Sequence, residues 1–244
     1  MKSQSNIFVF ETPEQLALAA AERFVECARE LPGTNERFSV ALAGGNTPRR
    51  VYELLATEPF NHQVEWSKVH LFFGDERCVP PEHRDSNYAM VKEALISKVP
   101  IPENNVHRII GEGNANDNAL AYEDELRSYF TGLAWPRFDL VLLGMGEDGH
   151  TASLFPDSAA LKERSRWVVP TRNEQLGQDR ITLTVPVFNH ARRLMFLVTG
   201  QKKAQRLKEV LRPQPGSAQL PVQAITPIQG TLEWLVDADA ASLV

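Results

Sequence analysis

Residues 138–151 read Phe-Asp-Leu-Val-Leu-Leu-Gly-Met-Gly-Glu-Asp-Gly-His-Thr, an apolar run followed directly by a glycine-rich turn. The run Leu140–Leu143 has the length and composition of a strand buried on both faces, as in a parallel sheet. The turn that follows can bend tightly or approach a ligand, because glycine tolerates conformations that other residues avoid. The stretch therefore predicts a buried strand whose carboxyl end presents Asp148 and His150 for chemistry.

Gly144–Gly149 also matches the G-x-G-x-x-G pattern of dinucleotide-binding turns. Three features disfavour that interpretation. Glu147 and Asp148 place negative charge where a pyrophosphate would bind, and Pro156 limits a long helix directly after the turn. The next strand-like run, Trp167–Val169, ends at a proline instead of the acidic residue that would bind a ribose. A role other than dinucleotide binding is favoured.

The composition of the whole chain indicates one α/β domain covering residues 1–244. Of its 244 residues, 43% are hydrophobic and 23% charged, which is ordinary for a soluble globular protein. The formal net charge of -5 argues against a nucleic-acid surface. The apolar stretch Ile7–Phe10 is too short for a signal peptide, and no run reaches membrane-spanning length. We therefore expect a cytoplasmic protein with a small-molecule partner.

The sequence contains no recognisable metal or covalent-nucleophile motif. Its 2 cysteines, Cys27 and Cys78, form neither a disulfide framework nor a metal-ligand spacing. Cys78 could act as a nucleophile, although an ordinary reduced thiol is favoured. None of the 6 histidines forms an H-E-x-x-H pair, and no serine lies in a G-x-S-x-G elbow. Water is the simplest attacking species, with no cofactor or metal expected.

Strand and helix patterns alternate along the chain. Thr12 is expected to cap a helix that has Pro13 at its first position, Gln15 completing a capping box, and an end near Leu31. The expected strands are Phe38–Ala43, Val69–Phe73, Val106–Ile110, Phe138–Leu143, Arg180–Val185, Leu194–Val198 and Thr231–Val236. Further helices are expected from Pro48, over Asn87–Val99, over Asn116–Phe130 with Leu120, Leu126 and Phe130 packing inward, and over Gln201–Leu211. This alternation predicts a mostly parallel, Rossmann-like sheet with helices on both faces.

Four polar loops are expected to meet at one edge of that sheet. They follow Ala43, Phe73, Leu143 and Val198, and parallel strands all end at the same edge. The loops contain Gly44-Gly45-Asn46-Thr47, Gly74-Asp75-Glu76-Arg77, Glu147-Asp148-Gly149-His150 and Thr199-Gly200-Gln201-Lys202-Lys203. Gly74–Asp85 and Pro213–Pro227 are expected to be irregular connections. An active site assembled from distant segments is predicted.

Two of these loops open helices, whose free amide groups attract anions, so phosphate is the natural ligand. Gly44 and Gly45 allow the backbone to wrap around it. Thr47 could donate its hydroxyl or cap the helix ahead of Pro48. Arg77 and Lys203 could supply positive charge, although Lys203 could equally be a solvated helix residue.

His150 is the candidate general base, since an unperturbed pKa of ~6.5 lets histidine accept and return a proton near neutral pH. Asp148 or Asp75 could orient it. The alternatives are a structural histidine that tethers the loop, and aspartates that cap their own loops.

Several segments resemble the 6-phosphogluconolactonases of the pentose phosphate pathway, whose fold is shared with glucosamine-6-phosphate deaminase. The similar segments are Ala41–Pro48, Phe73–Pro80, Asp85–Asn87, Gly144–Pro156, Arg180–Thr184 and Gly200–Ala204. The resemblance implies hydrolysis of 6-phospho-D-glucono-1,5-lactone without cofactor or metal. It also implies His150 as the catalytic histidine beside Asp148, with Arg77, Arg180 and Lys203 as substrate and phosphate ligands.

Two other functions are compatible with this fold. Amino-sugar-phosphate deaminases typically continue the Asp-Gly-His loop with Ile-Ala-Phe-Asn-Glu, whereas Thr151–Phe155 follow here. A non-catalytic sugar-phosphate sensor would normally carry an attached DNA-binding helix pair, whereas this chain begins almost at once with the expected first strand and helix. Lactone hydrolysis is therefore the favoured function.

Overall fold

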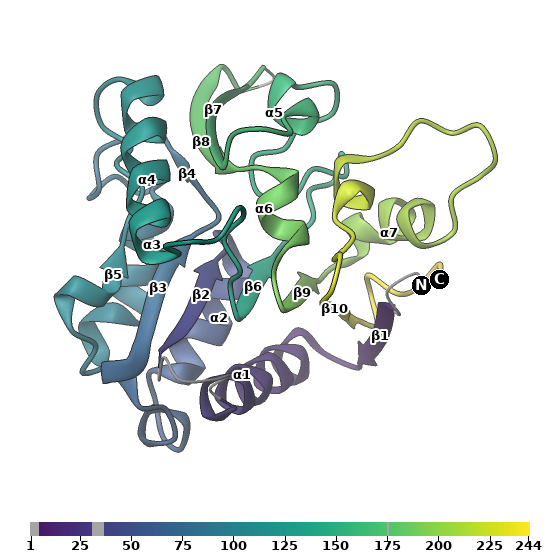
Figure 1. The fold of residues 1–244 in the computed structure, drawn as a ribbon. Helices are drawn as coiled ribbons and strands as arrows, with labels where there is room; N and C mark the ends of the chain where they lie inside the picture. Colours follow the sequence, from purple (N-terminus) through teal and green to yellow (C-terminus); the bar gives the residue numbers. More distant parts are fainter. Residues whose placement is uncertain (1–4, 31–36, 175) are drawn as a thin grey trace.

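A parallel sheet of seven strands forms the centre of the computed structural model, which describes residues 5–30, 37–174 and 176–244 (Figure 1). In spatial order the strands are β1 (Ser5–Phe10), β10 (Thr231–Asp237), β9 (Arg193–Val198), β6 (Leu140–Leu143), β2 (Phe38–Leu42), β3 (Val69–Phe73) and β5 (Val106–His107). Every neighbouring pair is parallel. The predicted parallel sheet is confirmed, with the expected strand 106–110 reduced to its first two residues.

Helices cover both faces of this sheet. Helices α1 (Pro13–Arg29), α2 (Asn46–Leu55) and α3 (Asn87–Ala94) contact one another in sequence along the chain. Figure 1 shows α1 on the opposite side of the sheet from α4 (Ala115–Tyr129) and α6 (Val185–Asn189). The remaining helices are α5 (Ala159–Lys162), α7 (Ala204–Leu211) and 3-10 turns at Phe60–His62, Trp66–Lys68, Ile96–Lys98, Glu103–Asn105, Gln201–Lys203 and Pro221–Ala224.

The start of α1 forms largely as the sequence predicts. The Thr12 hydroxyl accepts a hydrogen bond from the Gln15 N–H at 3.2 Å, as an N-cap should. The Gln15 side chain, however, accepts from the N–H of Glu11, one residue before the position that a capping box requires. The described helix ends at Arg29, and the predicted end near Leu31 lies outside the described residues.

A second, antiparallel sheet corrects the prediction of a single sheet. It has the order β4 (Asp75–Arg77), β8 (Gln178–Leu183) and β7 (Val168–Asn173). Part of the expected loop Gly74–Asp85 is therefore a strand, and the expected strand Arg180–Val185 lies outside the parallel sheet and gives way to α6. Residue patterning identifies an extended segment but not its partner strand, which explains the error.

Three helix predictions are wrong in detail. The helix expected over Gln201–Leu211 begins at Ala204, after a 3-10 turn over Gln201–Lys203. Helix α3 ends at Ala94, and a 3-10 turn replaces its expected last turn up to Val99. On α4, Leu126 and Phe130 are buried as expected, but Leu120 is 48% exposed. The buried face carries Glu123 instead, whose carboxylate accepts hydrogen bonds from the N–H groups of Trp167 and of Val168, the first residue of β7. Hydrogen bonding across the two elements thus decides which face of α4 turns inward.

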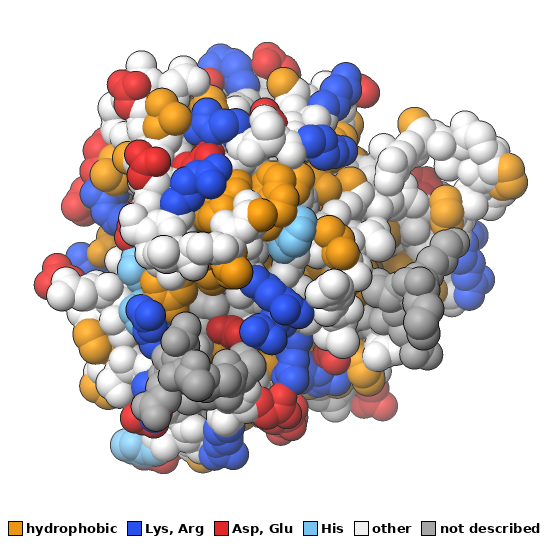
Figure 2. Space-filling model, in the orientation of Figure 1, with side chains coloured by type: hydrophobic (Ala, Val, Ile, Leu, Met, Phe, Trp, Pro, Cys, Tyr) orange, Lys and Arg blue, Asp and Glu red, His pale blue; other side chains and the backbone are white. Residues whose placement is uncertain are grey.

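A single cluster of buried apolar side chains includes residues of both sheets, and we propose that they fold as one domain. On the face shown in Figure 2, basic and acidic side chains are interspersed over the surface. Among the described residues, no helix has the length and apolar character needed to cross a bilayer.

Candidate active site

The four predicted loops follow four adjacent strands, β9, β6, β2 and β3. After β2 the chain proceeds to β3 and β5 on one side, and then returns to β6 on the other side. Ligands bind at such a switch point in parallel α/β sheets. A cavity of about 220 Å³ lies here, lined by Ala43, Gly44, Gly45, Asp75, Arg77, Asn87, Gly144, Met145, Gly146, His150, Thr151, Ala152, Arg180 and Lys203. The predicted convergence of these loops is confirmed.

His150 and Asp148 are held together by the glycine turn after β6. The turn is closed by hydrogen bonds from the Gly146 N–H to the His150 carbonyl (2.8 Å) and from the Gly149 N–H to the Gly146 carbonyl (3.1 Å). A Cβ atom on Gly146 would lie 2.1 Å from His150 Nδ1 and 2.6 Å from Asp148 Oδ1. Only glycine at this position leaves room for the pair.

The contact between the two side chains fixes the tautomer of the imidazole. His150 Nδ1 lies 2.5 Å from Asp148 Oδ1, which also accepts the His150 backbone N–H at 3.1 Å. Burial raises the pKa of Asp148, but the hydrogen bonds from His150 outweigh burial and lower it to about 2. An ionised carboxylate only accepts hydrogen bonds, so Nδ1 carries the proton and Nε2 of the neutral ring keeps its lone pair.

Two arginines face each other across the β4–β8 pair. Arg77 and Arg180 are direct partners in this antiparallel register, where like charges repel. Burial, and then the neighbouring Arg77 charge, lower the pKa of Arg180. Arg180 Nη2 donates to Gln178 Oε1 at 2.9 Å, and Arg180 Nη1 lies 4.0 Å from Asp75 Oδ2. Arg77 Nη1 donates to the Asp85 carbonyl at 2.5 Å. Such a pair is suited to a multiply charged anion.

Lys203 reaches the same cavity from the loop after β9. Burial lowers the pKa of its ammonium group, partly offset by Glu147 and Asp148. The loop is anchored by the buried Asp237 at the end of β10, whose two carboxylate oxygens each lie 3.0 Å from the Gly200 N–H. Sequence reasoning did not identify Asp237, because its role depends on the neighbouring strand.

Asp75 lines the cavity, but its carboxylate is occupied by other side chains. Oδ2 accepts from the Ser153 hydroxyl at 2.5 Å, and Oδ1 accepts from Asn87 Nδ2 at 3.3 Å. Among the described residues, the side chain of His150 is hydrogen-bonded to Asp148 and not to Asp75. Asp75 therefore connects the loop after β3 to the loop after β6, and it is placed to position Arg180 and not the base.

The glycine loop after β2 is shorter than predicted. Gly45, with a φ of 101°, is the N-cap residue of α2, so Asn46 and Thr47 belong to the first turn of the helix. Thr47 is thus not an N-cap. Its hydroxyl lies 2.7 Å from the Thr199 hydroxyl and links this helix to the loop after β9. Gly44 and Gly45 line the cavity, whereas neither Asn46 nor Thr47 does.

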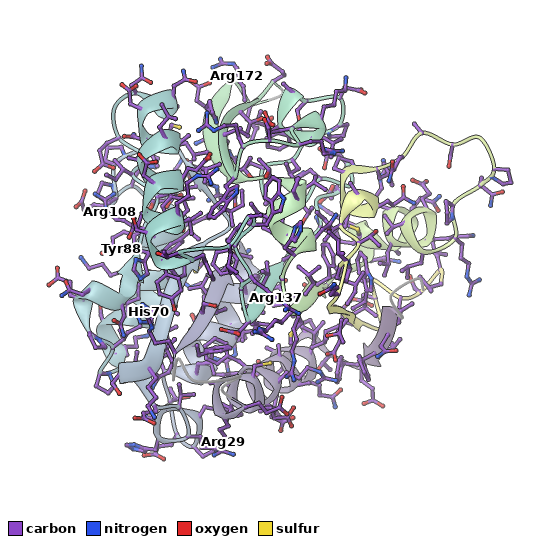
Figure 3. All side chains as sticks on the ribbon, viewed as in Figure 1. Arg29, His70, Tyr88, Arg108, Arg137 and Arg172 are labelled. Carbon is purple, nitrogen blue, oxygen red and sulfur yellow. The ribbon has the colours of Figure 1, made fainter. Side chains whose placement is uncertain are left out.

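Sequence reasoning missed the network that places the start of α3. The buried Glu76 carboxylate accepts from the N–H groups of Asn87 (2.7 Å) and Tyr88 (2.8 Å), while Ser86 caps the helix by accepting from the Ala89 N–H. Tyr88 also lies beside Arg108, whose guanidinium is 5.7 Å from the ring centroid (Figure 3). The Ser-Asn pair after Asp85 was an available helix-start signal.

Two alternatives from the sequence are disfavoured by the geometry. No long helix follows Gly149, since the next helix, α5, begins only at Ala159, so a dinucleotide would lack the helix N-terminus it needs. Burial, with the nearby Asp179 and Glu76 charges, raises the pKa of Cys78 to about 11, which makes it a poor nucleophile. Within the described residues, no group of three His, Cys, Asp or Glu side chains could hold a metal ion.

Comparison with known proteins finds 6-phosphogluconolactonases of similar sequence and similar fold. A 6-phosphogluconolactonase of Synechocystis is 43% identical over 205 residues, covering 83% of this chain and 82% of the relative. One from Haemophilus influenzae is 34% identical over 239 residues, covering 98% and 100%. The structure of 6-phosphogluconolactonase from Trypanosoma cruzi superposes with a TM-score of 0.89 at 31% identity, covering 99% and 97%.

A monomeric glucosamine-6-phosphate deaminase superposes with a TM-score of 0.82 at 20% identity, covering 98% of this chain and all (100%) of the other, which establishes the shared fold alone. The family described as glucosamine-6-phosphate isomerases/6-phosphogluconolactonase matches residues 11–234. On this match, and on relatives covered almost end to end, the chain belongs to the glucosamine-6-phosphate isomerase/6-phosphogluconolactonase family.

Proposed function

We propose that this protein hydrolyses 6-phospho-D-glucono-1,5-lactone to 6-phospho-D-gluconate, the second step of the oxidative pentose phosphate pathway. The observation that carries the proposal is His150, whose Nδ1 is bonded to an ionised Asp148, in one cavity with three cationic side chains. A general base beside an anion site is what hydrolysis of a phosphorylated lactone needs. The phosphorylated lactone is the small-molecule partner, and the cytoplasm is the expected location.

In the proposed reaction, His150 Nε2 removes a proton from a water molecule as the water oxygen attacks the lactone carbonyl carbon. The carbonyl π bond breaks and its electrons move to the oxygen, giving a tetrahedral oxyanion. Collapse of that intermediate re-forms the carbonyl and breaks the bond to the ring oxygen, which takes the proton from the His150 imidazolium. The product is the open-chain acid, and His150 returns to its neutral form.

The cavity also supplies charge stabilisation. In this proposal Arg77, Arg180 and Lys203 hold the phosphate, and backbone amides near Gly44 and Gly45 stabilise the oxyanion; all five residues line the cavity. A well-placed donor of this kind contributes about 3 kcal/mol to the transition state. Binding of the remote phosphate positions the lactone carbonyl near His150. The phosphate therefore raises the rate of the chemical step as well as the affinity for the substrate.

Lactone hydrolysis is favoured over deamination by two observations. The residues after His150 are Thr151–Phe155, unlike the Ile-Ala-Phe-Asn-Glu typical of the deaminases. Relatives from Synechocystis, Haemophilus influenzae and Aggregatibacter actinomycetemcomitans, at 43%, 34% and 33% identity, are named 6-phosphogluconolactonases, while the deaminase structure is only 20% identical.

A direct assay tests the proposal. Freshly generated 6-phosphogluconolactone is added to the protein, acid release is followed continuously, and spontaneous hydrolysis is subtracted. A His150→Gln variant should lose nearly all enzymatic rate, because glutamine cannot accept the proton, while its circular dichroism spectrum stays that of the parent. Full activity in the variant would exclude His150 as the base, and release of ammonia from glucosamine 6-phosphate by the parent would favour a deaminase.

A further inference from the structure

Buried polar atoms without a partner are concentrated in residues that line the active-site cavity. Among the described residues, seven buried side-chain nitrogen or oxygen atoms make no hydrogen bond. Four of them belong to residues that line this cavity: Arg77 Nε, Asn87 Oδ1, Thr151 Oγ1 and Arg180 Nε. An unpartnered buried polar atom costs stability, so a concentration of them in one cavity indicates a ligand that satisfies them.

The two arginine nitrogens are donors and belong with the phosphate. Asn87 Oδ1 is different, because an amide oxygen only accepts hydrogen bonds and would repel a phosphate oxygen. Its orientation is fixed: Nδ2 donates to the Asp75 carbonyl at 2.8 Å and to Asp75 Oδ1 at 3.3 Å, so the amide cannot be reversed. The residue is 1% exposed, and a Cβ on Gly44 would lie 1.9 Å from Oδ1.

Thr151 follows the catalytic histidine directly and is also 1% exposed. Its backbone carbonyl accepts from the Leu154 N–H at 2.9 Å, which fixes the residue next to His150 while its hydroxyl remains without a partner. Asn87 Oδ1 can only accept a hydrogen bond, whereas the Thr151 hydroxyl can donate or accept one. A ligand in the cavity can therefore be recognised by an acceptor and by a hydroxyl.

We propose that Asn87 Oδ1 and Thr151 Oγ1 bind ring hydroxyls of the lactone and so make the enzyme selective for fully hydroxylated sugar lactones. The inference rests on the proposed function. Apart from its phosphate, the lactone carries hydrogen-bond donors only at its three ring hydroxyls, at C2, C3 and C4. A site built to bond a substrate hydroxyl rejects an analogue that lacks it, because the buried protein atom is then left unpaired.

The test measures kcat/KM for 6-phosphogluconolactone and for its 2-deoxy, 3-deoxy and 4-deoxy analogues. The parent should prefer the complete lactone over at least one deoxy analogue by about tenfold to a hundredfold. Asn87→Ala and Thr151→Val should each lower the preference against one analogue about tenfold or more, and Thr151→Ser should retain it. Removing a hydroxyl also changes the intrinsic reactivity of the lactone, but this inductive effect is the same for every variant. A difference between parent and variant in the ratio of the two kcat/KM values therefore reports the lost contact alone.

Asn61 provides a matched control, since its Oδ1 is likewise buried and unpartnered but lies outside the cavity. Asn61→Ala should leave every preference at the parent value. Equal preferences in the parent, Asn87→Ala and Thr151→Val, with normal hydrolysis of the complete lactone, would overturn the inference and leave the proposed function intact. No hydrolysis of any phosphorylated lactone by the parent would overturn the function itself. If Asn87→Ala does not fold, Thr151→Val still tests the inference, because valine preserves the shape of the threonine side chain and removes only its hydroxyl.

Discussion

The expected ability of His150 to accept a proton at Nε2 depends on Asp148, which lies in the same turn. Asp148 accepts from both the ring Nδ1 and the backbone N–H of His150, so a single carboxylate fixes the tautomer and the ring orientation. Both side chains are about a third exposed, at 32% and 31%, which leaves the ring accessible to water while the pair stays formed. The tautomer and orientation of the proposed base are therefore set within the three consecutive residues Asp148, Gly149 and His150.

The same contact makes stability depend on pH. The pKa of Asp148 is lowered in the folded protein to about 2 from its ordinary 3.8, so the ionised form is favoured by folding. Its contribution to the free energy of unfolding is then present above about pH 4 and is lost as the pH falls toward 2. The difference in stability between the parent and Asp148→Asn, from urea unfolding at a series of pH values, should shrink over that interval. A constant difference would contradict the pairing.

At the level of elements, the turn after β6 can be predicted from the local sequence, whereas the pairing of β4 with β8 cannot. The buried strand Leu140–Leu143 and its glycine turn follow from local pattern, and both are confirmed. The β4–β8 pair joins residues about a hundred positions apart and places Arg77 opposite Arg180. No local pattern encodes that register.

The glycine turn gives a sharp prediction. In Gly146→Ala the added methyl would occupy the space of His150 Nδ1 and Asp148 Oδ1, so the pair should separate and kcat should fall at least about a hundredfold. Gly144→Ala is the control for the pair itself and not for kcat, since its Cβ would meet no protein atom within 4 Å although the residue lines the cavity. The downfield proton NMR signal of the Nδ1–H bonded to Asp148 should disappear only in the first variant. If the signal persists in Gly146→Ala, the turn accommodates the methyl group with the pair intact, and the prediction is wrong.

On the scale of the whole molecule, the parallel sheet and the antiparallel sheet each contribute part of the site. The parallel sheet brings His150 and Lys203 to its carboxyl edge, and the second sheet adds Arg77 and Arg180. Three cations in one cavity repel one another without a ligand, so an anion should stabilise the whole fold.

This stabilisation is measurable with the reaction product. At ten times its dissociation constant, 6-phosphogluconate should raise the free energy of unfolding of the parent by about 1.4 kcal/mol. Gluconate at the same concentration should have little effect, and Arg180→Gln should lose most of the gain. Arg172→Gln is the matched control, because Arg172 lies on the same small sheet but pairs with Asp179 outside the cavity (Figure 3). Equal stabilisation by gluconate would argue against a phosphate site.

Much of the fold was predictable because strand and helix periodicity is a local property. The convergence of four loops also followed, since parallel strands share a carboxyl edge. The errors have a common origin in long-range contacts: Leu120 is exposed because Glu123 bonds to a distant strand, and Thr47 pairs with Thr199 instead of capping α2. Asn87 and Asp237 were missed for the same reason.

The sequence by itself determined the separate strand and helix segments, the glycine turn and the proposed pair of Asp148 and His150, because each depends on residues close together in the chain. The tertiary structure alone decided the second sheet, the opposition of Arg77 and Arg180, and the concentration of unpartnered polar atoms in one cavity. Those features depend on which distant backbones pair, and pairing is governed by the packing of the whole molecule and not by any local pattern.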